Sequence, residues 1–185
     1  MTSIDTTRPN CDATSVGVLI TDPDGRILLF ERVKPPYGLA PVAGHIDEHG
    51  GAAQAAVAEV AEEVGLEVTS LRWVSDGWVR NHCRRSPHPG QAGHHWTVYR
   101  ADWTGQVRLG ADEARRPRWV DHTELQALVA RTVAYAHGDI DDTAWGAEPG
   151  LEPVWVSLLP GIGLPAADLA AVIALYARTP HGAAA

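Results

Sequence analysis

The sequence predicts an α/β or α+β fold, in which strands and helices alternate along one chain. Two observations support this class. Several short segments are rich in β-forming residues, whereas residues 51–64 and 121–137 carry apolar residues at helical spacing. With 185 residues, of which 45% are hydrophobic, the chain is long and apolar enough for one domain with a substantial core.

The first predicted elements are two strands in residues 15–33, which we expect to form a hairpin around the Asp-Pro-Asp-Gly turn at 22–25. A Gly- and Pro-rich loop is predicted over 34–51. A helix follows over 51–64, and Gly65 is a natural C-cap because glycine adopts the left-handed conformation at low cost. The N-terminal half is therefore expected to run strand, turn, strand, loop and helix.

The rest of the chain continues the mixed pattern. Strands are predicted around 66–81, 94–105 and 116–120, then a helix over 121–137 capped by Asp121 or Thr123, and helical segments at 151–159 and 165–179. The segments 82–93 and 138–150 are predicted loops. We divide the chain into an N-terminal segment (1–14), a main domain (15–145) and a C-terminal helical segment (146–185) packed on the same domain.

Charge and composition exclude several classes of protein. The formal net charge of −8 offers little attraction for a nucleic acid polymer. The first residues lack the basic and apolar regions of a signal peptide, and no apolar run approaches the ~20 residues of a membrane span. We therefore expect a cytoplasmic protein with no membrane partner, in which Cys11 and Cys83 are reduced thiols.

Three glutamates crowd the end of the helix predicted over 51–64. On a helical period, Val57, Val60, Ala61 and Val64 form one apolar stripe, with Glu59, Glu62 and Glu63 on the opposite side. A solvated acidic face is the simplest interpretation. However, the glutamates repel one another at i, i+3 and i, i+4, no basic residue lies nearby, and the helix dipole disfavours anions there. A bound divalent cation such as Mg²⁺ or Mn²⁺ would reverse both effects.

The segment from Gly44 to Leu66 resembles the Nudix box. The family's glycine, glutamate and aliphatic positions are matched by Gly44, Glu59, Val60, Glu62, Glu63, Gly65 and Leu66. The likeness extends over about residues 15–130 and implies an α/β/α sandwich around a mixed β-sheet. Two positions depart from the pattern, since Gly50 replaces the first glutamate and Ala58 replaces the arginine before Glu59.

The resemblance also implies a reaction. Nudix proteins typically hydrolyse a P–O–P bond in a nucleoside diphosphate derivative or a nucleoside triphosphate with Mg²⁺ or Mn²⁺. By position, Glu59, Glu62 and Glu63 would hold the metal together with the backbone carbonyl of Ala43. Glu113, with Asp112 second, is our candidate for an additional acid, although a solvated loop carboxylate is an equally good interpretation. Arg32 is a candidate phosphate ligand, or else an ordinary surface arginine.

The loop 82–95 contains His82, Cys83, His88, His94 and His95, which are all zinc-compatible. No regular ligand spacing organises them, so we favour a loop that borders the substrate pocket. In that interpretation Arg84 and Arg85 bind phosphates, and His95, Trp96 or Trp78 contacts a base.

A rival hypothesis from another class is a catalytically weak Nudix-like module that binds a nucleotide and regulates a partner. Gly50 and Ala58 favour it, whereas the three retained glutamates favour the enzyme. The expected partner in either case is a small nucleotide-type molecule, and the C-terminal segments could cover the core or form a homodimer interface.

Overall fold

The computed structural model describes residues 11–34, 36–46, 49–81, 83, 93–110, 114–158, 160 and 169–175. The elements in chain order are β1 (Thr14–Ile20), β2 (Ile27–Arg32), β3 (Leu39–Ala40), β4 (Val42–His45), α1 (Ala52–Val64), β5 (Glu67–Arg80), β6 (Gly93–Thr104), β7 (Ala114–Val120), α2 (His122–His137), α3 (Asp142–Ala147), α4 (Pro153–Leu158) and α5 (Leu169–Ala174). The predicted mixture of strands and helices is confirmed.

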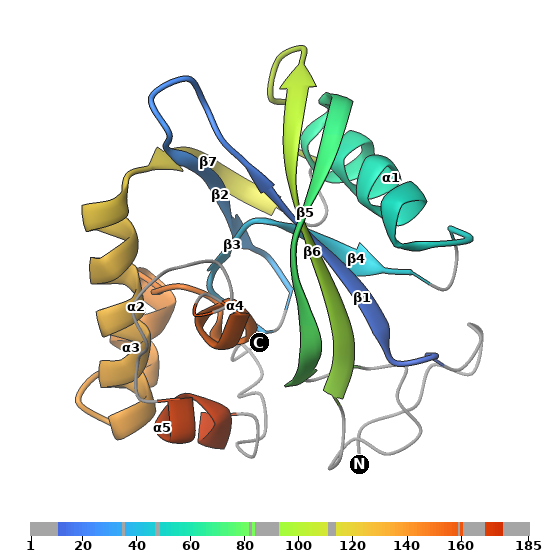
Figure 1. Cartoon of the computed structure of the whole chain (residues 1–185). Coiled ribbons are helices and arrows are strands. Elements are labelled where there is room, and N and C mark those ends of the chain that lie inside the picture. Colours follow the sequence, from blue (N-terminus) through green and yellow to red (C-terminus); the bar gives the residue numbers. More distant parts are fainter. Residues whose placement is uncertain are drawn as a thin grey trace.

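The strands form two sheets between layers of helices. One sheet has the order β4-β1-β6-β5 and the other β3-β2-β7. The larger sheet is mixed, because β1 runs parallel to β6 and antiparallel to β4. Helix α1 lies on one side of the strands, and α2, α3, α4 and α5 lie on the other (Figure 1). The predicted α/β/α arrangement is therefore confirmed.

The predicted hairpin over 15–33 is wrong beyond its turn. The turn itself forms, with the Asp22 carboxylate accepting hydrogen bonds from the backbone N–H groups of Asp24 and Arg26 at 3.0 and 2.9 Å. After a single bridge between Thr21 and Ile27, however, β1 and β2 enter different sheets. Turn chemistry is local, whereas the choice of sheet depends on partners that are distant in sequence.

Three short elements lie in segments predicted to be loops. Strands β3 and β4 fall within 34–51, and helix α3 falls within 138–150. Two to six residues are too few to display a period-2 or helical repeat, which explains the omission. The start of α3 carries a recognisable signal in retrospect, because the Asp141 side chain accepts a hydrogen bond from the N–H of Ala144 at 2.8 Å.

The ends of the two long helices follow their capping residues. Helix α1 ends at Gly65, which adopts a left-handed φ of 66° and donates its N–H to the Ala61 carbonyl at 3.1 Å. Helix α2 begins after Asp121, whose side chain accepts from the N–H of Glu124 at 2.8 Å. Of the two predicted caps, Asp121 is therefore the one used.

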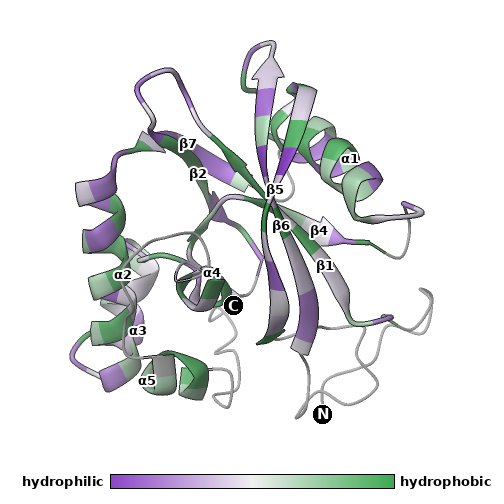
Figure 2. Cartoon of the chain, viewed as in Figure 1, coloured by the Kyte–Doolittle hydropathy of each residue, from purple (hydrophilic) through white to green (hydrophobic). Residues whose placement is uncertain are grey.

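Two hydrophobic clusters lie on the two faces of the strands, and each includes residues of both sheets. One includes Trp96 and Trp155 and receives α2, α4 and α5, and the other includes Phe30 and receives α1. Figure 2 shows hydrophobic residues, in green, along β1 and β2 and on α4 and α5. Among the described residues, none of the helices combines the length and the hydropathy that a membrane crossing requires.

A buried carboxyl group lies where the C-terminal segment joins the smaller sheet. Glu152 is 2% exposed, and its N–H donates to the Leu39 carbonyl at 2.8 Å. Burial raises the pKa of Glu152 from 4.5 to about 7, although the positive charge of Arg32 and hydrogen bonds from the N–H groups of Val154 and Trp155 oppose the rise. The folded protein therefore binds this proton more tightly than the unfolded chain does.

We expect Glu152→Gln to remove a pH dependence of stability. In the wild type, the neutral carboxyl group contributes to the free energy of unfolding. This contribution is fully present below the unfolded pKa of 4.5 and is lost as the pH rises through about 7. Above that pH the variant should unfold with a free energy higher by up to about 3 kcal/mol, since one pKa unit is worth about 1.4 kcal/mol. Urea unfolding at several pH values measures the effect, with the exposed Glu148→Gln as the control. Equal pH slopes in wild type and Glu152→Gln would contradict the expectation.

Candidate active site

Helix α1 is rotated relative to the predicted apolar stripe. Val60 and Val64 are fully buried as predicted, but Val57 is 44% exposed and Ala61 is also exposed. The buried side of the helix consists of Ala55, Ala56, Val60, Glu63 and Val64. The prediction assumed that valines mark the buried side of the helix. In the structure, small alanine side chains lie on the buried side and let the helix approach β1 and β4 closely. Consequently, the three glutamates do not share one solvated face.

The carboxylate of Glu59 lies directly against the backbone of β4. A Cβ atom added at Gly44 would be 1.6 Å from Glu59 Oε1, so this contact requires glycine at position 44. The Glu59 side chain is only 15% exposed, and its Oε1 lies 3.8 Å from His49 Nε2. The geometry gives the glycine at the start of the box a physical role, which is to leave space for a carboxylate contributed by α1.

Glu63 is held by the neighbouring residue of the same strand. Its Oε2 accepts a hydrogen bond from the N–H of Ala43 at 3.0 Å, and the residue is only 7% exposed. Glu62, by contrast, is exposed to solvent. Two of the three glutamates are therefore oriented by β4, and the third faces water beside them.

These oxygen atoms suit a hard divalent cation, which prefers carboxylate, carbonyl and water ligands. The assignment of Glu59, Glu62, Glu63 and the Ala43 carbonyl as metal ligands stays a prediction. Among the described residues, a different group of side chains has the ligand atoms for a metal within 4.8 Å of one another. This group is formed by Cys11, His45, Cys83 and His94. Sequence spacing gave no sign of that group or of the contact between His49 and Glu59.

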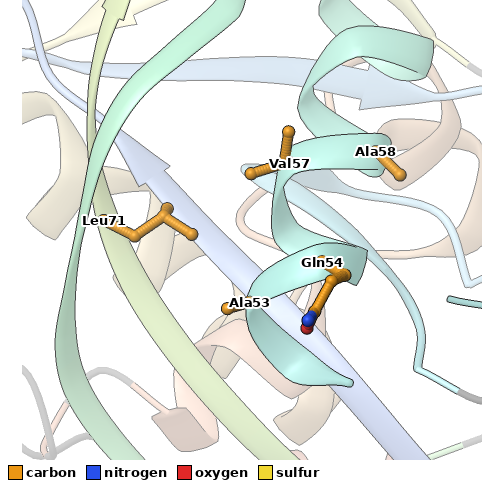
Figure 3. A pocket seen from close by; sticks show the side chains of 5 residues that line it. All are labelled: Ala53, Gln54, Val57, Ala58 and Leu71. Atoms are coloured by element: carbon orange, nitrogen blue, oxygen red, sulfur yellow. The ribbon is translucent and has the colours of Figure 1, made fainter. Parts of the chain in front are cut away.

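The two residues that differ from the Nudix box pattern, Gly50 and Ala58, have different surroundings. Gly50 has a left-handed φ of 79°, which a glutamate would adopt only with strain. Ala58 lines a shallow hollow of about 490 Å³ between α1 and β5, together with Ala53, Gln54, Val57 and Leu71 (Figure 3). This hollow is mainly apolar, and the contacts of Glu59 and Glu63 lead instead to β4. Of its five lining residues, Gln54 alone carries a polar side chain, so the hollow is poorly suited to a metal or a phosphate.

Arg32, the predicted phosphate ligand, ends β2. Its Nε is buried and has no hydrogen-bond partner among the described residues. Its positive charge acts on the nearby Glu152. A buried donor that lacks an acceptor is costly, so this nitrogen is well suited to a ligand oxygen.

The three residues proposed to contact a base differ in exposure. Trp96 is only 5% exposed and packs edge-on against Trp155 with ring centroids 6.1 Å apart, so the proposal that Trp96 contacts a base is wrong. Trp78 is 62% exposed and pairs across strands with His95, whose Nε2 lies 3.5 Å from Asp76 Oδ2. Trp96 and His95 are adjacent in β6 and so point to opposite faces of the sheet.

The remaining candidate residues lie outside the described residues. These are the additional acid Glu113 with its alternative Asp112, the arginines Arg84 and Arg85, and the loop histidines His82 and His88. Their assigned roles stay predictions.

Comparison with known proteins identifies the family. The model of the NUDIX domain matches residues 12–140. An RNA pyrophosphohydrolase of Caulobacter vibrioides is 38% identical over 74 residues, which are 39% of this chain and 40% of that protein, so the match spans about two fifths of the relative's length.

Solved structures agree on the fold. The dihydroneopterin triphosphate pyrophosphohydrolase of E. coli superimposes with a TM-score of 0.52 and 22% identity over 66% of this chain and 88% of that one. A NUDIX hydrolase from Nitrosomonas europaea gives a TM-score of 0.51 and 19% identity over 65% and 77% of the two chains. At these identities the likeness concerns the fold alone. The domain match over residues 12–140 shows that this chain belongs to the Nudix family.

Proposed function

We propose that this protein is a pyrophosphohydrolase that cleaves a P–O–P bond in a small nucleotide-type molecule with Mg²⁺ or Mn²⁺. The observation that carries the proposal is the close fit of α1 to β4. Glu59 occupies the space left by the missing side chain of Gly44, and Glu63 accepts a hydrogen bond from the Ala43 N–H. Such oriented carboxylates beside a backbone carbonyl are a suitable oxygen donor set for a hard cation.

In the proposed mechanism Glu59, Glu62, Glu63 and the Ala43 carbonyl would hold the metal. When bound, a divalent cation neutralises the negative charge on phosphoryl oxygens and lowers the pKa of a coordinated water. The protein contributes orientation. Glu59 and Glu63 are held in place by β4, and Glu59 or Glu62 would orient the attacking water.

Recognition of the substrate is assigned to residues outside this set of metal ligands. Arg32 offers a buried, unsatisfied Nε to a phosphate oxygen. His95 and the exposed Trp78 form a neighbouring pair that suits stacking against a base. Arg84 and Arg85 as phosphate ligands and Glu113 as an additional acid complete the proposal.

A substrate screen tests the proposal. Purified protein should release nucleoside monophosphate, phosphate or pyrophosphate from at least one nucleoside diphosphate derivative or triphosphate, and only with Mg²⁺ or Mn²⁺ present. Because the Caulobacter relative is named an RNA pyrophosphohydrolase, a triphosphorylated RNA oligonucleotide belongs in the screen. Reaction in isotopically labelled water identifies which phosphorus is attacked.

The same screen separates the enzyme from the binding module. If a nucleotide binds by calorimetry but is not hydrolysed with either metal, the rival hypothesis of a regulatory module replaces this proposal. Gly50 and Ala58 are the residues that favour that outcome. The net charge of −8 favours a small substrate over a nucleic acid polymer. Selective cleavage of the RNA oligonucleotide would contradict the expectation of a small substrate.

A further inference from the structure

Two cysteines and two histidines from three separate regions of the sequence meet at one end of the larger sheet. Cys11 precedes β1, His45 ends β4, Cys83 lies between β5 and β6, and His94 is in β6. Their ligand atoms all lie within 4.8 Å of one another. His94 and Cys83 are buried, at 2% and 9% exposure. We propose that these four residues bind a structural Zn²⁺ ion.

The interatomic distances fit tetrahedral zinc. Cys11 Sγ lies 3.3 Å from His94 Nε2, and Cys83 Sγ lies 3.5 Å from His45 Nε2. With Zn–S near 2.3 Å and Zn–N near 2.0–2.1 Å, a sulfur and a nitrogen on one tetrahedral ion are separated by roughly 3.6 Å. Two thiolates and two imidazoles form a complete set of four ligands, as in structural zinc sites, which leave no position open for a substrate.

Surrounding groups orient the ligands. Ser15 Oγ lies 2.6 Å from His94 Nδ1 and is itself buried, so the other ring nitrogen, Nε2, faces the cluster. Hydrogen bonding of the non-ligating nitrogen is a regular feature of zinc-bound histidines. The N–H of Ala13 donates a hydrogen bond to Cys11 Sγ at 3.3 Å, which orients that sulfur. Ala13 adopts a positive φ of 61° at this turn.

Strand pairing brings the ligands together. Ser15 pairs with His45 across β1 and β4, and the N–H of His95 donates to the Ala13 carbonyl at 2.8 Å. The zinc ion would therefore tie together the segment before β1, the end of β4, the segment after β5 and the start of β6. His45 directly follows Ala43 and Gly44, so the same ion would also fix the strand on which Glu59 and Glu63 rest.

Metal content of the wild-type protein is the first test. Protein without a polyhistidine tag, purified under reducing conditions from zinc-supplemented culture, should contain one zinc per chain by plasma mass spectrometry, and Mg²⁺ should not displace it. Replacement by Co²⁺ should give thiolate-to-metal charge-transfer bands and the intense visible bands of tetrahedral cobalt. Zinc well below one per chain, or cobalt spectra without thiolate bands, would overturn the proposal.

Variants then assign the ligands. Cys11→Ser and Cys83→Ser should lose stoichiometric zinc, and a zinc-selective chelator added in excess Mg²⁺ should lower the wild-type melting temperature by roughly 10 °C. His95→Asn is the matched control, because His95 adjoins His94 in β6 but points to the other face, and it should retain one zinc. A Cys11–Cys83 disulfide is the competing outcome. Protein purified without reductant that lacks zinc and titratable thiols, and that gains two titratable thiols when it is unfolded and reduced, would establish the disulfide instead.

Discussion

Glu62→Gln and Glu63→Gln are expected to lower metal-dependent turnover by at least about a hundredfold each, because in the proposed mechanism each change removes the charge of a metal ligand. Neither change should unfold the protein. Glu62 is exposed, and glutamine at 63 retains an oxygen that can accept the hydrogen bond from the Ala43 N–H. The measurement is kcat and KM on the cleaved substrate across a Mg²⁺ titration, with thermal unfolding recorded for every variant.

Glu67→Gln is the matched control for charge. Glu67 is exposed and begins β5 just after the helix, so its neutralisation changes the net charge equally without touching β4. Its turnover should stay within a factor of about two of the wild type. If Glu62→Gln or Glu63→Gln keeps the wild-type kcat and an unaltered metal titration, the substituted glutamate is not a metal ligand.

Gly44→Ala should reduce turnover by about a hundredfold while the fold remains intact. The added Cβ would lie 1.6 Å from Glu59 Oε1, and the side chain of Glu59, which is flexible, must move away. Displacement of a reacting or metal-binding group by about 1 Å can cost a hundredfold in rate. Kinetics and metal titration measure the effect, and circular dichroism checks the fold.

Two comparisons isolate the role of Gly44. Gly77→Ala is the matched control, because Gly77 is also in a strand and a Cβ there meets nothing within 4 Å. In a Glu59→Gln background, Gly44→Ala should cause little additional loss, since both changes act through the same carboxylate. Additive losses would show that position 44 affects catalysis by another route.

Features encoded by local chemistry could be predicted from the sequence. The left-handed Gly65 ended α1 and the Asp121 side chain capped α2, as their positions indicated. These signals depend on neighbouring residues, so a single sequence contains them in full.

Features that depend on strand pairing could not be predicted. The separation of β1 from β2 and the gathering of Cys11 with His94 both result from register between distant strands. The search for zinc ligands within the loop 82–95 assumed that ligands lie close in sequence. Burial of Glu63 was missed for a related reason, because its partner is the backbone of Ala43, which has no side-chain signature.

The parallel pairing of β1 with β6 has a consequence for biosynthesis. Strand β1 lies inside the larger sheet, and nearly all of its residues are buried, yet one of its two neighbours begins only at Gly93. Ser15 and His94, which meet there, are 79 residues apart, so at about 5–20 residues per second β1 waits roughly 4 to 16 s on the ribosome for that neighbour. During this interval its apolar side chains and open strand edge are exposed. The nascent chain is therefore most vulnerable to aggregation, and most dependent on chaperones, before β6 emerges.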